Sequence, residues 1–268
     1  MKKVYLTLAA IIRDQEHYVK EWLTFQKLVG FERFLIALHR CSDQTESAIR
    51  SLPFSDDIIL RRYESGDYIQ MSVYSEWMRD FRNTTFWMAF FDGDEYLYGV
   101  NADDLKPVLT GFESCGSVLV HNHEFGASNH VLRPSGLSID AFTWRASNHH
   151  WMHRNIKSFI RADSWQWFLS PHLAKTSREW VREDHNVIHE SDLSFKCSVS
   201  SQPPISNIIR YNHYHTRSME DWIQRYLIYS GPKNTKFDVA GFRHHDHHTV
   251  EDFTIQKFST KLSEQLKE

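Results

Sequence analysis

Three carboxylates stand together in Asp92-Gly93-Asp94-Glu95, directly after the apolar run 87–91. Carboxylates gathered at the end of a buried strand repel one another, and burying them costs free energy unless a cation neutralises them. Oxygen ligands suit Mg²⁺ or Mn²⁺, and such an ion can bridge to a diphosphate. The tetrapeptide therefore predicts a divalent metal site. The other interpretation is structural, since Asp-Gly is also a common turn sequence.

Two other enzyme classes also use paired carboxylates. Aspartyl-phosphate phosphatases of the haloacid dehalogenase type have Asp-x-Asp after an apolar strand, but a Thr or Val normally comes two residues after the second Asp. Tyr96 stands there in this chain, which disfavours that class. Glycoside hydrolases use two carboxylates as acid and base, but their chemistry needs no nucleotide pocket.

The elements around this motif follow from the apolar patterning of the first half of the chain. Continuous apolar runs predict short buried strands, and apolar residues spaced three and four apart predict amphipathic helices. Because strands and helices alternate, we expect βαβ units, an α/β fold and a mostly parallel central sheet flanked by helices. Ligands of such sheets bind beyond the carboxyl ends of the strands. The predicted strands are 4–12, 34–38, 58–62 and 87–91, and the predicted helices are 18–29, 45–52 and 71–81.

The second half of the chain is less regular. A helix over 102–109, a strand over 117–120, a helix over 219–229 and a closing amphipathic helix over 249–266 are predicted, whereas 122–171 shows little periodicity. The patterning has no repeat and no linker, so we expect one domain over residues 1–268. Residues 1–100 form its nucleotide-binding half in this interpretation, and residues 101–268 form an acceptor-side half with C-terminal helices.

Composition limits the partners and the compartment. The chain has 268 residues, 41% of them hydrophobic and 14% aromatic, which is typical of a globular protein. A formal net charge of −3 and the lack of a long basic block disfavour nucleic acid as a partner. Three cysteines without a Cys-x-x-Cys pair favour a reducing compartment. Since no run reaches the roughly 18 apolar residues of a spanning helix, we expect a cytoplasmic protein, at most peripheral to a membrane. The oligomeric state stays open.

The order of the motifs resembles glycosyltransferases with the GT-A fold, namely glycosyltransferase family 92 and its bacterial and viral family 2-like relatives. The matching segments run collinearly over nearly the whole chain. They are Arg13-Asp14-Gln15-Glu16, Tyr18-Val19-Lys20-Glu21-Trp22, Gly30-Phe31, Asp92-Gly93-Asp94-Glu95-Tyr96, Phe125-Gly126 with His130, Arg133-Pro134-Ser135-Gly136, Lys157-Ser158-Phe159-Ile160-Arg161, and Asn212-His213-Tyr214-His215-Thr216-Arg217-Ser218 followed by Glu220.

This resemblance implies a GT-A-type nucleotide-diphospho-sugar transferase fold and a metal-dependent hexosyltransferase-type activity. A sugar would pass, with inversion, from a nucleotide-diphosphate donor such as a UDP-sugar to a hydroxyl of a glycan, glycolipid or glycoprotein, as in polysaccharide biosynthesis. The implied cofactor is Mn²⁺ or Mg²⁺. The alternative is a non-catalytic carbohydrate- or nucleotide-binding protein on a transferase scaffold.

The resemblance also implies roles for individual residues. The metal ligands would be Asp92, Asp94, His213 and His215, with Asp92 touching the ribose or the metal. The residues expected to bind the nucleotide sugar fall into two sets, one at the base and ribose and one at the diphosphate, where guanidinium forks suit paired oxygens. They are Arg13, Glu16, Asp43 and Gln70 in the first set, and Lys157, Arg161, Arg217 and Arg225 in the second.

Two assignments remain open at the level of the sequence. Transfer with inversion needs a general base, and the candidates are Glu124, Asp163 and Asp184, among which spacing does not choose. The run His244-His245-Asp246-His247-His248 could bind zinc, but it has no Cys partner. A solvated loop is the favoured interpretation of this run, with a lid over the donor site as the alternative.

Overall fold

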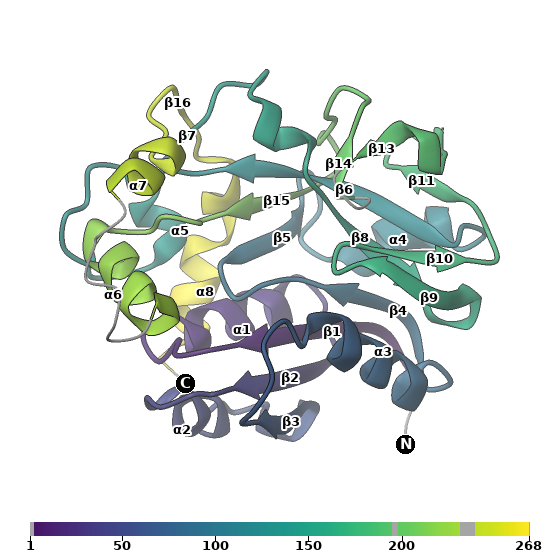
Figure 1. Ribbon diagram of the computed structural model, residues 1–268, viewed down its shortest axis with the longest axis horizontal. Coiled ribbons are helices and arrows are strands. Elements are labelled where there is room, and N and C mark those ends of the chain that lie inside the picture. Colours follow the sequence, from purple (N-terminus) through teal and green to yellow (C-terminus); the bar gives the residue numbers. More distant parts are fainter. Residues whose placement is uncertain (1–2, 195–197, 231–238, 268) are drawn as a thin grey trace.

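The structure is a computed structural model, described for residues 3–194, 198–230 and 239–267. Its first half contains four parallel strands in the order β3-β2-β1-β4, joined by helices (Figure 1). The apolar runs and helical spacings predicted these elements to within about three residues at each end. The elements are β1 (Val4–Ile12), α1 (Val19–Leu28), β2 (Arg33–His39), α2 (Thr45–Arg50), β3 (Ile58–Tyr63), α3 (Gln70–Phe81) and β4 (Thr85–Phe90).

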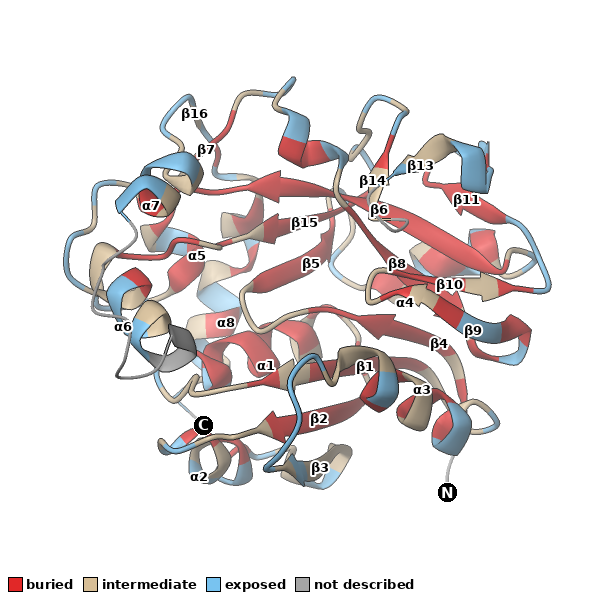
Figure 2. Ribbon diagram, in the orientation of Figure 1, coloured by how far each residue is buried: buried red, intermediate tan, exposed pale blue. Residues whose placement is uncertain are grey.

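Alternate residues of these strands pack into two separate cores. Leu8 of β1 and Ile36 of β2 belong to the core under α1, together with Trp22 of that helix. The intervening Ala9 and Leu35 belong to the core under α3. Strands buried on both faces read as continuous apolar runs, and Figure 2 shows β1, β2 and β4 buried along most of their length, whereas the edge strand β3 is only partly buried.

The second half extends the sheet with antiparallel and parallel pairs. Strand β8 lies between β4 and β6 and is antiparallel to both, and β15 pairs in parallel with β6 and antiparallel with β5. Short hairpins and helices complete this half. Its strands are β5 (Glu95–Gly99), β6 (Ser117–Glu124), β7 (Trp144–Arg145), β8 (Ile156–Arg161), β9 (Trp165–Ser170), β10 (Leu173–Thr176), β11 (Trp180–Arg182), β12 (Val187–Ile188), β13 (Leu193–Ser194), β14 (Val199–Ser200), β15 (Ile209–His213) and β16 (Val250–Glu251). Its helices are α4 (Leu105–Leu109), α5 (Ser138–Ala141), α6 (Met219–Ser230), α7 (Val239–His245) and α8 (Ser259–Gln265).

The prediction of one helix over 249–266 was wrong. This segment forms β16, a 3₁₀ turn (Thr254–Phe258) and the short helix α8. The reason is Asp252, whose carboxylate is buried against Arg145 and Arg210 and also accepts from the amide of Thr254. These contacts hold the chain in a turn where the apolar spacing alone favours a helix.

The segment 122–171 contains three strands, β7, β8 and β9, that its lack of periodicity did not reveal. Strand β8 carries Lys157 and Ser158 into the interior, so its sequence does not read as an apolar run. The α/β class and the mostly parallel central sheet flanked by helices are confirmed. In the part of the chain that the structure describes, the helices are too short or too polar to cross a membrane.

Candidate functional site

A cleft of about 780 Å³ lies at the carboxyl ends of β1, β2 and β4. The parallel register brings these three strand ends to one edge of the sheet, as expected for a ligand site of this class of fold. The segments following β3 and β15, together with α6, complete the walls. The cleft is lined by Ile11, Ile12, Arg13, Gln15, His39, Arg40, Asp67, Tyr68, Ile69, Gln70, Asp92, Gly93, Asp94, His213, His215 and Arg225.

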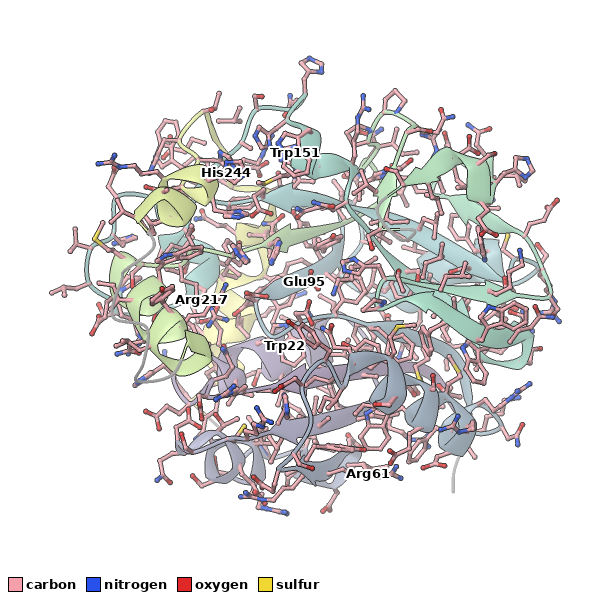
Figure 3. The ribbon with its side chains drawn as sticks, viewed as in Figure 1. Trp22, Arg61, Glu95, Trp151, Arg217 and His244 are labelled. Atoms are coloured by element: carbon pink, nitrogen blue, oxygen red, sulfur yellow. The ribbon has the colours of Figure 1, made fainter. Side chains whose placement is uncertain are left out.

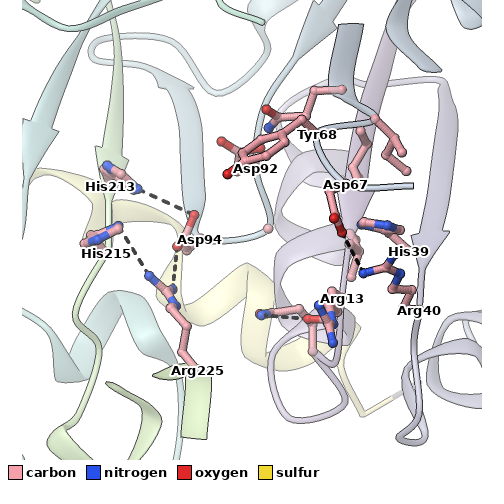
Figure 4. Close-up of a pocket in the computed structure, with 16 residues that line it drawn as sticks. Arg13, His39, Arg40, Asp67, Tyr68, Asp92, Asp94, His213, His215 and Arg225 are labelled. Carbon is pink, nitrogen blue, oxygen red and sulfur yellow. Dashed lines mark hydrogen bonds and ion pairs between the residues drawn. The ribbon is translucent and has the colours of Figure 1, made fainter. Parts of the chain in front are cut away.

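Asp94, His213 and His215 come together on one wall of this cleft (Figure 4). One ligand atom from each lies within 4.8 Å of the other two. Asp94 belongs to the turn between β4 and β5, whereas His213 ends β15, so the antiparallel pairing of β5 and β15 brings them together. The Nε2 atom of His213 lies 3.6 Å from Oδ1 of Asp94. These three residues were predicted metal ligands, although Asp94 lies far from the two histidines in the sequence.

This set of donors fits a divalent transition metal. One carboxylate oxygen and two imidazole nitrogens are the mixed oxygen and nitrogen ligands that such ions accept, whereas Mg²⁺ prefers oxygen alone. Burial and the neighbouring Arg225 lower the pKa of His215 to about 3, so its ring is neutral, as a ligand must be.

Glu124 lies behind His213, on the side away from Asp94. Its Oε2 atom is 3.1 Å from Nδ1 of His213, and its Oε1 atom is 3.1 Å from Nδ1 of His245. Asn122 also donates to Oε2 at 2.8 Å. Burial raises the pKa of Glu124, but the two histidines outweigh it and hold that pKa well below its usual range. With both oxygens engaged and only 2% of the residue exposed, Glu124 orients His213.

Lys157 neutralises the other two carboxylates of the acidic motif. Its Nζ atom lies 2.7 Å from Asp92 Oδ2 and 3.0 Å from Glu95 Oε2. Burial raises the pKa of Glu95 to about 7, with Lys157 opposing the shift. The repulsion that the sequence indicated is thus relieved at Asp92 and Glu95 by a buried ammonium group. Of the acidic motif, only Asp94 belongs to the group of three residues that could hold a metal, and Asp92 does not.

Arg217 supports the acidic turn through a hydrogen bond to its backbone. It donates to Gln15 Oε1 at 2.6 Å and to the carbonyl of Gly93 at 2.8 Å, and it lies 3.7 Å above the ring of Tyr18. Trp22 in α1 donates to the carbonyl of Glu95 at 2.8 Å, and Figure 3 shows both near the middle of the molecule. These contacts place Arg217 in support of the turn that carries Asp94.

The predicted base and ribose residues divide into two groups. Arg13 and Gln70 line the cleft. Glu16 and Asp43 join the loops after β1 and β2: Asp43 accepts from the amide of Glu16 at 2.9 Å, and Glu16 accepts from the amide of Gln44 at 2.9 Å. They hold the rim of the cleft in shape.

Several lining residues were not predicted as site residues from the sequence, among them His39, Arg40, Asp67 and Tyr68. Arg40 pairs with Asp67 at 2.9 Å, and His39 Nε2 lies 2.9 Å from the carbonyl of Gly66. Tyr68 is 96% exposed and has a left-handed backbone, with φ of 58°. A large aromatic residue in that conformation is rare, and sequence patterning does not reveal it.

Arg161, Asp163 and Asp184 lie away from the cleft. Arg161 pairs with Trp87, near the start of β4, so it sits at the opposite end of the strand from Asp92. Its guanidinium group donates a hydrogen bond to the carbonyl of Glu113 and forms an ion pair with Asp163. Asp184 pairs with Arg182 at 2.7 Å beyond β11. The fold does not bring these residues to the cleft that Asp94 and His213 share.

The favoured interpretation of residues 244–248 as a solvated loop was wrong in part. His244 and His245 form the last turn of α7, and His245 contacts the buried Glu124. Asp246 accepts from the amide of Ala127 at 2.7 Å, directly after Phe125-Gly126. The segment is thus attached to the site by two polar contacts, which the spacing of its histidines did not indicate.

Comparison with known proteins confirms the resemblance read from the motifs. A glycosyltransferase family 92 protein of Oryza sativa subsp. japonica is 22% identical over 173 residues, which cover 63% of this chain and 28% of the relative. Another family 92 protein, from Ricinus communis, is 24% identical over 132 residues, which cover 49% of this chain and 23% of the relative. The chain therefore spans about a quarter of the length of these curated relatives.

No protein-family model matches the chain. Among solved structures, residues 1–349 of S. aureus TarS align with 68% of this chain and 53% of their own, at 13% identity and a TM-score of 0.40.

Proposed function

We propose that this chain is a metal-dependent glycosyltransferase that uses a nucleotide-diphosphate sugar. The observation that supports this most is the convergence of Asp94, His213 and His215 on one wall of a cleft at the carboxyl ends of three parallel strands. A cation there would face the same space as Arg13 and Arg40 on the opposite side. An anionic ligand suits this arrangement, with its diphosphate at the metal and its nucleoside beside the arginines.

The proposed reaction is a single displacement with inversion at the anomeric carbon. The acceptor hydroxyl oxygen forms a bond to that carbon while the bond from the carbon to the β-phosphate oxygen breaks. The electron pair leaves with the nucleoside diphosphate, and the hydroxyl proton passes to a carboxylate that lines the cleft. A bound divalent ion would stabilise the charge on the leaving diphosphate.

The residues of the chain divide this work. His213, oriented by Glu124, and Asp94, on the turn braced by Arg217, would hold the cation. We propose a UDP-sugar as donor and a hydroxyl of a glycan, glycolipid or glycoprotein as acceptor, following the family resemblance. Among the two cofactors implied by the resemblance, we propose Mn²⁺, because two of the three ligand atoms are imidazole nitrogens.

Nucleotide binding tests the proposal without knowledge of the acceptor. Melting temperatures are measured with UDP, GDP and CMP, each with and without Mn²⁺, for the wild type and for Asp94→Asn. We expect one nucleotide to stabilise the wild type only when Mn²⁺ is present, since a ligand that binds only the folded state raises its melting temperature. Asp94→Asn removes a ligand charge and should abolish that shift.

Asp56→Asn is the matched control, because Asp56 is exposed and is not one of the residues lining the cleft. It should behave as the wild type. Stabilisation by a nucleotide without metal, unchanged in Asp94→Asn, would favour a nucleotide-binding protein without transferase chemistry. The reaction itself is followed by mass spectrometry of products from a panel of UDP-sugars.

A further inference from the structure

We propose that Arg225 competes with the divalent cation for Asp94 and His215, and that the guanidinium group released by this competition binds the diphosphate. Cation and nucleotide binding would then be coupled through one side chain. This inference rests on the proposed function for its second half, whereas its first half concerns the cation alone.

The contacts of Arg225 carry the argument. One guanidinium nitrogen donates to Asp94 Oδ2 at 2.7 Å, and the other lies 3.3 Å from Nδ1 of His215 (Figure 4). The same guanidinium group therefore engages two of the three residues that could hold a metal. Asp94 Oδ1 faces His213 instead, so the guanidinium group covers the cluster from the α6 side.

A guanidinium group beside Asp94 and His215 opposes a metal ion at the same two residues, because it occupies one oxygen and one nitrogen that the ion could use. The guanidinium group keeps its proton in proteins, and it only donates hydrogen bonds. A nitrogen lone pair of His215 that accepts from Arg225 cannot ligate a cation at the same time. Two positive groups beside one carboxylate also repel each other. We therefore expect binding of a cation to weaken the contacts of Arg225, and Arg225 to lower the affinity for the cation.

The released side chain stays beside the cleft because its helix is fixed. Ser218 and Asp221 cap the start of α6: Ser218 Oγ accepts from the amide of Asp221 at 3.1 Å, and Asp221 accepts from the amide of Ser218 at 3.2 Å. Arg133 pairs with Asp221 at 2.8 Å. Arg225 already lines the cleft, and its planar fork suits the paired oxygens of a diphosphate.

The test uses two probes, Mn²⁺ alone and UDP with saturating Mn²⁺. In a Mn²⁺ titration followed by electron paramagnetic resonance, Arg225→Met should bind Mn²⁺ more tightly than the wild type. The expected gain is about tenfold, the effect of one hydrogen bond to a charged group. In calorimetry with UDP and saturating Mn²⁺, Arg225→Met should bind UDP about tenfold more weakly than the wild type, because one charged contact to the diphosphate is lost.

Two further variants keep the test sharp. Arg225→Lys retains a positive charge and should restore most of the competition, whereas Arg243→Met removes an exposed arginine of α7 and should leave both affinities unchanged. Thermal unfolding without ligands verifies that each variant is folded. Weaker or equal Mn²⁺ binding by folded Arg225→Met would overturn the competition. Tighter Mn²⁺ binding with unchanged UDP binding would overturn the transfer to the diphosphate, and a wild type that binds Mn²⁺ but no nucleotide would overturn the proposed function alone.

Discussion

Glu124 and His213 form a buried pair in which the carboxylate fixes the ring, with Oε2 3.1 Å from Nδ1. This contact leaves Nε2 of the same ring directed at Asp94. Burial lowers the pKa of His213, but Glu124 and Asp94 outweigh it and raise that pKa well above its usual range, so a cation that binds this ring has to displace a proton. A carboxylate behind an imidazole is the arrangement that sets the tautomer and orientation of a metal-ligating histidine.

Glu124→Gln should weaken Mn²⁺ binding by about 10- to 100-fold, the range found for partners of metal ligands. The amide keeps the size of the side chain but removes the charge that orients His213. Equilibrium dialysis of Mn²⁺ measures this change. Glu190→Gln is the control, since Glu190 is an exposed residue that pairs with Lys175. An unchanged Mn²⁺ affinity in Glu124→Gln would remove the positioning role assigned here.

Gly126→Ala should destabilise the fold and the attachment of α7. A Cβ atom at this position would lie inside van der Waals distance of the backbone nitrogen and oxygen of His247, and 2.9 Å from Asp246 Oδ1. Since backbone must shift, we expect a loss of about 1–3 kcal/mol, the usual cost of overpacking. The melting temperature, measured by circular dichroism, should fall by about 2–4 °C per kcal/mol.

Gly111→Ala is the control for this change. Within the described chain, its Cβ atom would meet no neighbour within 4 Å. The melting temperature of Gly126→Ala should therefore be lower than that of Gly111→Ala. Equal melting temperatures would contradict the close approach of His247.

Lys157→Met should destabilise the protein by about 3–5 kcal/mol, because it leaves buried charge unpaired. The side chain of Lys157 is 2% exposed and that of Glu95 is 3% exposed. Burial lowers the pKa of Lys157, but Asp92 and Glu95 outweigh it and raise that pKa above its usual value. Urea unfolding measures the change. Lys175→Met removes a half-exposed surface pair and should cost about 1 kcal/mol or less. Similar losses in both variants would argue against a buried pair.

Asp252→Asn should also cost about 3–5 kcal/mol, because it breaks a buried ion pair. Its Oδ2 atom accepts from Arg145 at 2.6 Å and from Arg210 at 2.9 Å. Burial raises the pKa of Asp252, but Arg210, Thr254 and Arg145 outweigh it and lower that pKa. The folded-state pKa thus lies below the unfolded value of about 3.9, and the unfolded state binds the proton first.

The stability that Asp252 contributes is therefore complete above the unfolded pKa, and it is lost progressively as the pH falls from that value toward the lower folded-state pKa. Between about pH 5 and pH 3, the free energy of unfolding of the wild type should fall more steeply than that of Asp252→Asn. Urea unfolding at half-unit pH steps measures both slopes, and parallel curves would contradict the ion pair.

The sequence by itself determined the α/β half and the acidic motif. Strands buried on both faces require continuous apolar runs, and helices that cover one face require apolar residues three and four apart. These constraints are local, so β1 to β4 and the helices α1 and α3 could be read directly. The position of Asp92-Gly93-Asp94-Glu95 after β4 followed from the same patterning. The order of motifs also predicted His213 and His215 as metal ligands, and the structure brings both beside Asp94.

Only the tertiary structure decided what each charged residue does. Lys157, Arg217 and Arg225 were all expected at a diphosphate, yet they contact Asp92, the Gly93 carbonyl and Asp94 respectively. Glu124 was expected to be a base and contacts two histidines. The physical reason is that an ion pair depends on which strands become neighbours, here β5 with β15 and β4 with β8. Partners that lie 65 to 131 residues apart leave no periodicity in the chain, so the fold alone assigns them.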